Sequence, residues 1–370
     1  NSFALDKKIS SDDMKLLEDA LLNEEAILSA IRSRSNISAV GCDGLSNGLW
    51  KVGANTSASI IKLIVMCMLD TGLFPEVLKM NKTVVLYKKG DVDDPHSWRP
   101  ITITPTLYRI LMCHISRSMQ SLNSHRPFIS PSQKGFMRIP AAASEHATMV
   151  DEMIHDAARN LKSLYITTID FSDAFGSIPQ ELIKKNLLSL GFDKSFVKSI
   201  MDSYVGSKTR ICCGGQKSDD VFIKRGVKQG CPLSPTLFNI CIESLVKRLS
   251  LMNKDGYHWF GRSTSVQAYA DDVIIFSDTE DGMCNLLRTI EQFCHYAGDM
   301  KINSKKCRCF SYVISNGVRC VPNLNFSIDD GIIDNVSIQG NTTYLGLPIA
   351  SRSSQRKKHI YRRIEELFKD

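Results

Sequence analysis

The sequence contains twelve cysteines but no C-x-x-C pair. Zinc ribbons and fingers hold their ion with cysteines at that spacing, so we expect no cysteine-bound metal. The adjacent pair Cys212 and Cys213 and the near pair Cys307 and Cys309 do not match such a site either. A secretory leader is also lacking, so we expect reduced thiols in the nucleus or the cytoplasm rather than a disulfide framework.

Long hydrophobic runs are lacking too. The longest, Ile60 to Leu69, is interrupted by Lys62 and is far shorter than the roughly 20 residues of a membrane span. We therefore expect no membrane association and interpret this run as a buried helix. Repeats and low-complexity tracts are absent, whereas 370 residues with 43% hydrophobic content can bury a core in two or three subdomains.

The net charge of +7 is unevenly distributed. From Arg352 to Asp370 seven basic residues face three acidic ones, which leaves +4 at this end of the chain. Such a segment is typical of a polyanion-binding protein, although a solvated helix face rich in Lys and Arg is the alternative. Because the chain begins at Asn1 without methionine and stops inside a charged helix, we expect an excerpt of a longer polypeptide.

The apolar pattern predicts an α+β protein with a mainly antiparallel sheet and helices packed on one face. Helices are predicted over residues 11–34, from the turn-rich segment 38–48 to about 69, and over 106–122, 141–162, 180–204, 233–251 and 282–296. Strands are predicted at 82–87 and 164–170, near Arg210 and near Phe222, and a hairpin is predicted over 265–277.

Two adjacent aspartates, Asp271 and Asp272, stand at the centre of the predicted hairpin between apolar segments. Burying unpaired charge costs several kcal/mol, so we expect a cation beside them. Asp170 ends the strand-like run LYITTID, where its carboxylate could meet the hairpin. Oxygen ligands suit Mg²⁺, and two ions roughly 4 Å apart can activate an attacking oxygen and stabilise a leaving one. A surface acidic cluster is the alternative.

Several motifs follow one another in a characteristic order. They are SAVGCDG at 38–44, SWRPI at 97–101, SQKGF at 132–136, IDFSDAF at 169–175, GVKQGCPLSP at 226–235, YADD at 269–272, GDMKINSKKC at 298–307 and YLGLP at 344–348. Over nearly the whole chain, this series resembles the reverse transcriptases of non-LTR (LINE-type) retrotransposons. Two positions depart from the pattern: Cys42 stands where proline is common, and Gly176 stands where the family usually has an acidic residue.

The resemblance implies a right-hand polymerase fold with fingers, palm and the start of a thumb. The implied boundaries are an N-terminal extension at 1–78, fingers at 79–140, palm at 141–178, a fingers insertion at 179–232, palm at 233–348 and the start of the thumb at 349–370. It also implies an RNA-directed DNA polymerase that extends the 3′-hydroxyl of a DNA or RNA primer with dNTPs on an RNA template, in target-primed retrotransposition. Further domains, such as a thumb and an endonuclease, are implied in the full-length protein.

The resemblance assigns the metal ligands residue by residue. Asp170 and Asp271 would bridge two Mg²⁺ ions, for which Mn²⁺ is an expected substitute. Asp272 would assist, and the backbone carbonyl of Phe171 would add a ligand.

Three residues are implied contacts of the incoming nucleotide. Phe175 would lie under its sugar and leave no room for a 2′-hydroxyl; a core phenylalanine is the alternative. Gln229 and Gly230 would contact the nucleotide, with glycine allowing close backbone approach; a glycine turn before a helix is the alternative.

Basic residues are implied for the triphosphate and the leaving group. Arg99, with Lys88 or Lys89, would clamp the triphosphate through charge-assisted hydrogen bonds; the two lysines could also be simply solvated. Lys306 would protonate the departing pyrophosphate, with neighbouring Lys305 or a solvated basic turn as alternatives.

Three rival functions remain open from the sequence. One is an intron-encoded maturase reverse transcriptase of the same fold. Another is an RNA-dependent RNA polymerase, which Phe175 disfavours because its ring would exclude ribonucleotides. The third is a polymerase fold kept only as an RNA-binding scaffold, for which the loss of at least one carboxylate would be expected.

Overall fold

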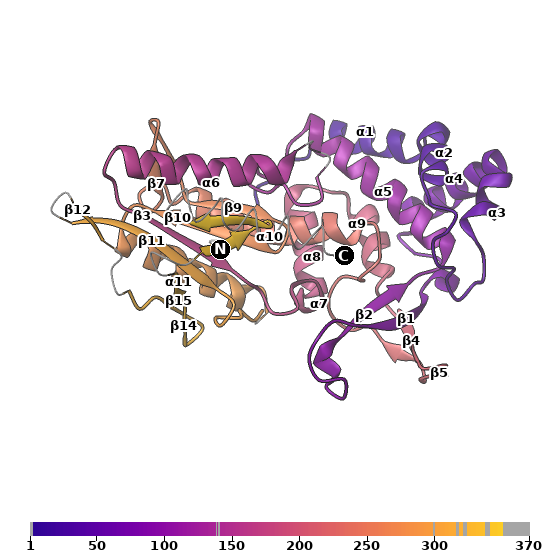
Figure 1. Cartoon of the computed structure of the whole chain (residues 1–370). Coiled ribbons are helices and arrows are strands. Elements are labelled where there is room, and N and C mark those ends of the chain that lie inside the picture. The colour runs from indigo at the N-terminus through magenta and orange to yellow at the C-terminus, as the bar shows by residue number, and fades with distance from the viewer. Residues whose placement is uncertain are drawn as a thin grey trace. The chain divides into compact units, whose positions relative to one another are not determined.

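The chain forms two compact units in the computed structural model (Figure 1). The structure describes residues 3–137, 139, 141–298, 300–315, 318–320, 324–336 and 341–350. Of these, residue 3 and those within 130–174 and 242–350 form what we call the sheet unit, and residues 4–129 and 175–241 form the helical unit. The chain therefore passes repeatedly between the two units. The basic segment Arg352–Asp370, and with it most of the predicted thumb, lies outside the described residues.

Helices make up most of the helical unit. They are α1 (Ser11–Leu21), α2 (Glu24–Arg32), α3 (Asn47–Val52), α4 (Ala54–Thr71), α5 (Thr106–His125), α8 (Gln180–Leu190) and α9 (Lys194–Asp202), with short 3₁₀ turns η1 (Glu76–Leu78) and η2 (Pro95–Ser97). The short helix α7 (Ala174–Ser177) and the long α10 (Ser234–Ser250) cross the boundaries between the units.

The prediction of a single helix over residues 11–34 is wrong, because the helix ends after α1 and a second helix, α2, begins at Glu24. Ser10 and Asp13 form a capping box that starts α1, and the side-chain oxygen of Asn23 accepts from the backbone N–H of Ala26 to start α2. Asn favours such a cap over a helix interior, since its side chain satisfies an otherwise unpaired N–H. A similar break at Gly53 separates α3 from α4.

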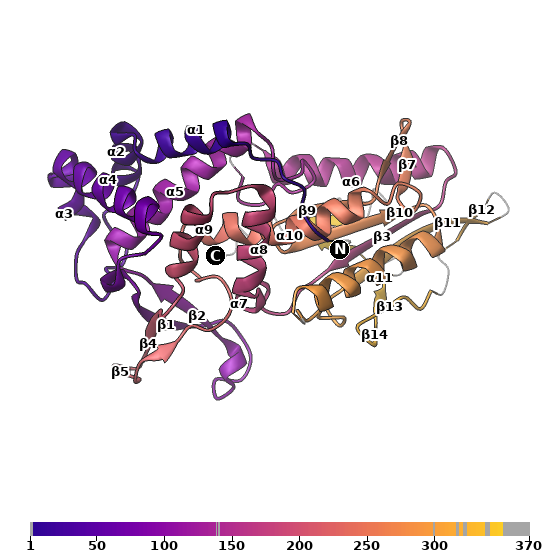
Figure 2. The ribbon, with the colours of Figure 1, turned by 180° about the vertical axis from the view of Figure 1, so that it is seen from behind.

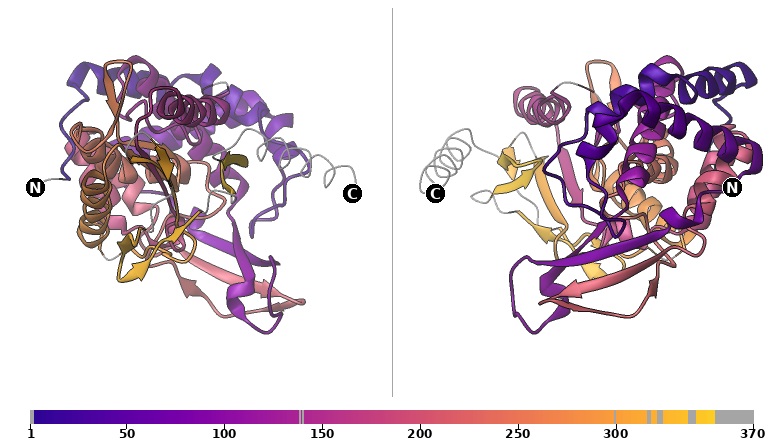
Figure 3. Two further views of the ribbon diagram at one scale, coloured as in Figure 1. Left: turned by 60° about the vertical axis from the view of Figure 1, so that its left-hand side comes forward. Right: turned by 90° about the vertical axis from the view of Figure 1, so that its right-hand side faces the viewer.

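A small sheet completes the helical unit, in the order β2-β1-β4-β5 with β6 paired to β4. Its strands are β1 (Met80–Tyr87), β2 (Trp98–Ile103), β4 (Lys208–Cys213), β5 (Gln216–Lys217) and β6 (Val221–Phe222). The right panel of Figure 3 shows β1 and β2 beside the later strand β4. The strands predicted near Arg210 and Phe222 are confirmed.

The larger sheet belongs to the sheet unit and has the order β12-β11-β3-β10-β9, with β15 paired to β11. Its strands are β3 (Leu164–Ile169), β9 (Val266–Tyr269), β10 (Asp272–Ser277), β11 (Arg308–Ser315), β12 (Val318–Cys320) and β15 (Asp334–Asn335). All pairs are antiparallel except β11 with β15. Separate hairpins are formed by β7 (Tyr257–Trp259) with β8 (Arg262–Thr264), β13 (Ser327–Ile328) with β14 (Gly331–Ile332), and β16 (Asn341–Tyr344) with β17 (Leu347–Ala350).

Helices cover both faces of this sheet, whereas the sequence predicted helices on one face. The helix α11 (Glu280–Tyr296) lies along one side (Figure 2), where Thr167 of β3 donates a hydrogen bond to the sulfur of Met283. The helix α6 (Ala142–Arg159) packs on the other side. Strand β3 is buried at nearly every position, and a strand apolar on both faces needs cover on both.

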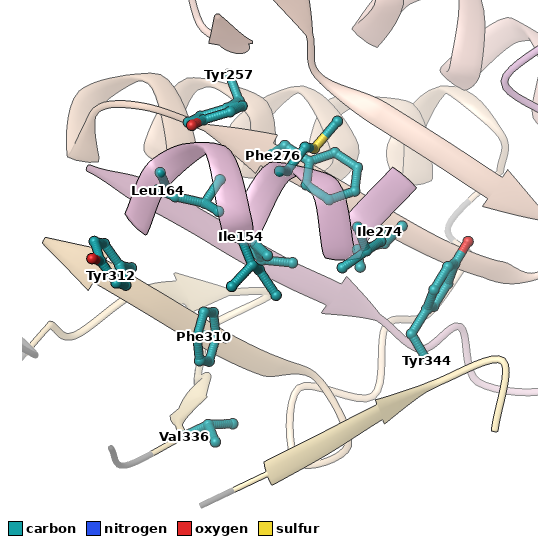
Figure 4. Close-up of a cluster of buried hydrophobic side chains, with 13 residues drawn as sticks. Ile154, Leu164, Tyr257, Ile274, Phe276, Phe310, Tyr312, Val336 and Tyr344 are labelled. Carbon is teal, nitrogen blue, oxygen red and sulfur yellow. The ribbon is translucent and has the colours of Figure 1, made fainter. Parts of the chain in front are cut away.

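The core beneath α6 is a cluster of apolar side chains (Figure 4). Its members include Ile154 of α6, Leu164 and Ile166 of β3, and Phe276 of β10. Tyr257 joins this cluster, and its hydroxyl donates to Asp156 of α6 at 2.6 Å. The cluster therefore fastens α6 to the middle of the sheet.

Two further features bear on the sequence predictions. Within the described residues no helix is both long and apolar enough to cross a membrane. Each of the twelve cysteines is a free thiol.

Truncating Phe276 should destabilise the sheet unit. Its ring is fully buried in the cluster under α6, so Phe276→Ala should lower the free energy of unfolding by about 3–5 kcal/mol through lost burial and the cavity left behind. The matched control is Phe260→Ala at the exposed β7–β8 turn, where the residue is 79% exposed and the change should stay within about 0.5 kcal/mol. Urea unfolding followed by circular dichroism measures both, and equal losses would contradict this assignment of the core.

Candidate active site

Strand β3 carries Asp170 to the end of the sheet. Its apolar and β-branched residues place it at the centre of the sheet, between β11 and β10. The backbone N–H of Asn303 donates to the Asp170 carbonyl at 2.8 Å, and the Asp170 N–H donates to the Cys307 sulfur at 3.5 Å. The Asp170 backbone is thus fixed, while its side chain remains 39% exposed.

The hairpin β9–β10 presents Asp271 and Asp272. Asp272 pairs with Tyr269, so the turn contains only Ala270 and Asp271. Ala270 has a φ of 56°, and a positive φ at the first of two turn residues is the pattern of a type II′ turn, which normally takes glycine there. The predicted hairpin is confirmed, with Asp271 in its turn and Asp272 at the start of β10.

The strand register brings the three aspartates together within the sheet unit. Val273 of β10 lies opposite Ile169 of β3, so the next positions along the two chains are Asp272 and Asp170. Directly opposed residues of an antiparallel pair share a face of the sheet. Asp170 and Asp272 therefore emerge on the same face, with Asp271 on the adjoining turn.

The three carboxylates influence one another electrostatically. Burial, followed by the charges of Asp271 and Asp170, raises the pKa of Asp272 to about 6. Burial and the charge of Asp170 also raise the pKa of Asp271 above its usual range. Raised pKa values of this kind mark negative charge that lacks sufficient cationic compensation.

The backbone of Phe171 is arranged so that its carbonyl is directed at this group. Phe171 pairs with Ile302 in an antiparallel bridge, and the hydrogen bonds run from Ser172 N–H to Lys301 carbonyl and from Asn303 N–H to Asp170 carbonyl. Phe171 is thus the non-hydrogen-bonded member of its pair, whose own N–H and carbonyl are directed away from the partner. Since β10 flanks β3 on that other side, the carbonyl faces the aspartate hairpin.

Lys306 is the lysine that contacts the carboxylate group. Its Nζ lies 3.3 Å from Oδ2 of Asp170, and its side chain is 61% exposed. Of the two neighbouring lysines that the sequence left open, Lys306 therefore stands beside the aspartates.

The oxygen atoms of the three aspartates and of the Phe171 carbonyl suit a hard divalent cation, although they do not form a closed coordination shell. Among the described residues, no three His, Cys, Asp or Glu side chains converge closely enough to hold an ion. Nevertheless, three interacting carboxylates with raised pKa values at two of them, and one carbonyl, offer the oxygen ligands that Mg²⁺ and Mn²⁺ prefer.

Phe175 lies in the helical unit and has an aromatic partner there. Its half-buried ring stacks on Phe238 of α10 with centroids 4.4 Å apart and an interplanar angle of 5°. Its carbonyl accepts from the Val227 N–H at 2.8 Å, and Gly226 lies so near Gly176 that a Cβ there would stand 2.7 Å from the Gly176 Cα. The turn after Ala174 is therefore joined to the segment that leads to Gln229.

Gln229 and Gly230 lie against β2 of the helical unit. The Gln229 carbonyl accepts from the Thr102 N–H at 3.1 Å. Gly230 has a φ of 105°, and a Cβ there would lie 2.4 Å from the Thr102 carbonyl oxygen. The preceding Lys228, which sequence reasoning did not single out, is buried, and its Nζ donates to the Ser203 carbonyl at 2.9 Å. Burial lowers the pKa of Lys228 to about 8.

The basic residues predicted to bind a triphosphate are exposed in the same unit. Arg99 lies on β2 opposite Leu86 of β1. Lys88 and Lys89 follow β1, and the Lys88 N–H donates to the Ser97 carbonyl at 2.8 Å. The β1–β2 hairpin thus holds all three at one end, with their charged groups available to solvent.

Sequence reasoning missed Gln133 and Gly135, although it quoted the SQKGF motif that contains them. Gln133 is 1% exposed and its side chain hydrogen bonds to Ala270 in the aspartate turn. Gln133 lies far from Ala270 in the sequence, so its contact with the turn could be recognised only from the folded structure.

Comparison with protein families and curated proteins gives consistent matches. The family profile of reverse transcriptase (RNA-dependent DNA polymerase) matches residues 86–349. The chain is 30% identical over 271 residues to the Retrovirus-related Pol polyprotein from type-2 retrotransposable element R2DM of Drosophila melanogaster, covering 73% of this chain and 24% of that protein. It is 31% identical over 286 residues to the corresponding polyprotein of a type-1 element R2 of Popillia japonica, covering 77% and 38%.

A more distant relative belongs to another mobile element. The RNA-directed DNA polymerase from mobile element jockey of Drosophila melanogaster is 23% identical over 287 residues, covering 75% of this chain and 30% of that protein. The chain spans well under half the length of each of these relatives. Among solved structures, apo telomerase from Candida tropicalis, truncated from its C-terminal domain, superposes with a TM-score of 0.50 at 15% identity, over 80% of this chain and 59% of that one. That likeness concerns the fold alone.

Adding a methyl group at Gly230 should strain the segment that carries Gln229. Gly230→Ala combines a left-handed backbone with a clash against the Thr102 carbonyl and should cost about 3 kcal/mol or more of stability. Gly215→Ala is the matched control, because Gly215 has a φ of 82° in open space and should lose only about 1–2 kcal/mol. Denaturant unfolding of the two variants compares them; equal costs would show that the close approach to Thr102 is unimportant.

Proposed function

The chain belongs to the reverse transcriptase (RNA-dependent DNA polymerase) family, and from this premise we propose that it is the polymerase core of a non-LTR retrotransposon protein. Its activity would be extension of a primer 3′-hydroxyl with dNTPs on an RNA template. The observation that carries the proposal is the register of β3 with β10, in which Ile169, just before Asp170, lies opposite Val273, just after Asp272. A family member that had lost catalysis would be expected to lack at least one of these carboxylates.

The carboxylates of Asp170, Asp271 and Asp272, with the carbonyl of Phe171, would hold two Mg²⁺ ions, or Mn²⁺ in their place. When bound, the ions supply positive charge that lowers the pKa of the primer hydroxyl and stabilises charge on the phosphates. The chain's part is to hold the ligands on a rigid sheet edge, because catalysis of this type depends on positioning and charge stabilisation rather than on a covalent side chain.

Lys306 would deliver the proton that the leaving pyrophosphate takes up. Its amine stands 3.3 Å from the Asp170 carboxylate. An exposed ammonium beside the carboxylates is suited to donate a proton to a departing phosphate oxygen.

The helical unit would bind the nucleotide. Arg99, with Lys88 or Lys89, would pair with the triphosphate. Gln229 and the backbone at Gly230 would contact the nucleotide, and the ring of Phe175 would lie under its sugar and exclude a 2′-hydroxyl. The stacking of Phe175 on Phe238 supports this role, since a steric gate needs a ring that cannot move aside.

The remaining proposals concern the larger protein. The limits of fingers and palm are proposed at 140/141, 178/179 and 232/233. The breaks between the compact units lie 11, 4 and 9 residues away from them, at 129/130, 174/175 and 241/242. We expect target-primed synthesis on an RNA template from a DNA or RNA primer, in the nucleus or cytoplasm. The relatives are longer polyproteins, which agrees with additional thumb and endonuclease domains.

Replacing Asp271 should abolish polymerisation. On a poly(rA) template with an oligo(dT) primer, Mg²⁺ and dTTP, the chain should extend the primer, and Asp271→Asn should lower the rate at least about 10²-fold because charge stabilisation is lost. Asp330→Asn, an exposed aspartate of the sheet unit at a φ of 58° that Asn tolerates, should retain activity.

The same assay separates the rival functions. If neither the intact chain nor its variant makes product while RNA is still bound, and a chain lengthened by the thumb does not restore synthesis, the RNA-binding scaffold is the better reading. Product from the intact chain that is retained in Asp271→Asn would remove this aspartate from the mechanism. A maturase-type enzyme would share the polymerisation but require its intron RNA for tight binding.

Shortening Phe175 should relax sugar selection. Phe175→Ala leaves room for a 2′-hydroxyl, so the ratio of rUTP to dTTP incorporation should rise about tenfold or more. The control Phe222→Ala removes an exposed ring of the same unit and should leave that ratio unchanged. Efficient RNA synthesis by the unaltered chain would instead identify an RNA polymerase, and an unaltered ratio in Phe175→Ala would reduce Phe175 to a packing role.

A further inference from the structure

The turn that carries Asp271 is flanked by a segment from a distant part of the sequence. Residues 132–135 lie along the outer edge of β9, where Gln133 and Ala268 form a parallel bridge. The Ala268 N–H donates to the Ser132 carbonyl at 2.8 Å, and the Lys134 N–H donates to the Ala268 carbonyl at 3.0 Å. The segment therefore extends the sheet by one short pairing beside the turn.

The side chain of Gln133 continues this pairing onto the turn itself. Its Oε1 accepts from the Ala270 N–H at 2.8 Å, and its Nε2 donates to the Ala270 carbonyl at 3.3 Å. These two groups belong to the peptide planes on either side of the Ala270 Cα. A single amide thus fixes both backbone dihedrals of Ala270, and through them the direction in which the chain enters Asp271.

Ala270 needs such support. At a φ of 56° it occupies the left-handed region, which residues other than glycine adopt at a cost and keep only when their surroundings hold them there. Relaxation of Ala270 to a negative φ would rotate the following peptide and carry Asp271 away from Asp170. The two hydrogen bonds of Gln133 oppose that rotation.

Gly135 makes the close approach possible. A Cβ on Gly135 would lie 2.0 Å from the Ala270 nitrogen and 2.6 Å from the Tyr269 carbonyl carbon, both of them backbone atoms that cannot move aside cheaply. The Gly135 N–H also donates to Oε1 of Gln133 at 2.8 Å. Two N–H groups meeting one atom identify it as the amide oxygen and fix the orientation of the side chain.

The segment is anchored at both ends within the sheet unit. The buried carboxylate of Glu243 accepts from the backbone N–H of Ser130 at 2.9 Å and also from its hydroxyl. Lys134 forms an ion pair with Glu145 on α6. Gln133 therefore acts from a fixed base rather than from a free loop.

We infer that Gln133 is a positioning residue for the metal-binding turn, holding Ala270 in its left-handed conformation so that Asp271 and Asp272 face Asp170. The inference rests on the proposed function for its consequence in catalysis. Its structural part concerns the turn alone and can be measured without polymerisation.

The test compares Gln133→Met with the unaltered chain. Methionine keeps the volume and removes every hydrogen bond of the amide. Mn²⁺ binding to the nucleic-acid-free chain, measured by titration calorimetry, should weaken about tenfold or more, and kcat for dTTP on poly(rA) should fall about a hundredfold while KM for dTTP changes little. Mn²⁺ affinity and kcat equal to those of the unaltered chain would overturn the inference.

A second change separates positioning from loss of stability. Glycine adopts a positive φ freely, so adding Ala270→Gly to Gln133→Met should restore Mn²⁺ binding and kcat at least in part. The matched control is Asn123→Ala, because Asn123 is also a buried amide whose oxygen accepts two backbone N–H groups, from Phe128 and Ile129 at 2.9 and 3.0 Å. It lies in the helical unit and should lower thermal stability without altering Mn²⁺ affinity.

The outcomes distinguish this inference from the proposed function. An unaltered chain that binds Mn²⁺ but never extends a primer, even when lengthened by the thumb, would defeat the proposed function. Weaker Mn²⁺ binding in Gln133→Met would still support the positioning role. An active chain whose Gln133→Met variant loses no more Mn²⁺ affinity than Asn123→Ala would defeat the positioning role alone. Failure of Ala270→Gly to restore any binding would likewise count against control of the Ala270 backbone.

Discussion

The antiparallel pairing of β3 with β10 is the constraint on which the candidate site depends. With Ile169 opposite Val273, Asp170 and Asp272 leave the sheet on one face; a slip of one residue would send one of them to the opposite face, because side chains alternate along a strand. The slip is resisted by burial, since β3 is apolar on both faces and packed under α6 on one and beside α11 on the other. The hydrophobic core thus sets the position of the charges.

Several locally unfavourable features lie at this end of the sheet. Burial, and after it the neighbouring carboxylates, raises the pKa values of Asp271 and Asp272. A non-glycine residue, Ala270, has a positive φ in the turn beside them. Each arrangement is unfavourable by itself and is held by well-packed surroundings, a pattern typical of functional sites. Lys306 offsets part of the charge from one side.

Much of the fold follows from local patterns in the sequence. Apolar flanks around Asp271 and Asp272 predict the hairpin, and the β-branched run before Asp170 predicts a strand that ends there; both are confirmed.

The break at Asn23 was missed because apolar periodicity continues across it and the cap acts locally. The cover of β3 by α6 was missed because a continuous apolar strand does not reveal how many faces are packed. The role of Gln133 depends on a contact across more than a hundred residues of sequence, which no local pattern contains. The ligand and nucleotide roles of the individual residues remain predictions, since they come from the family resemblance.

The central place of β3 also has a consequence for synthesis on the ribosome. The strand ends at Ile169, yet its neighbours β10 and β11 begin only at Asp272 and Arg308. Most of the chain between β3 and β10 belongs to the helical unit. While the chain emerges, β3 is an apolar strand with both edges unpaired, a state prone to aggregation. The helical unit, whose contacts within 4–129 are available earlier, can fold first. A nascent chain halted between β3 and β10 would therefore depend on chaperones that cover exposed strands.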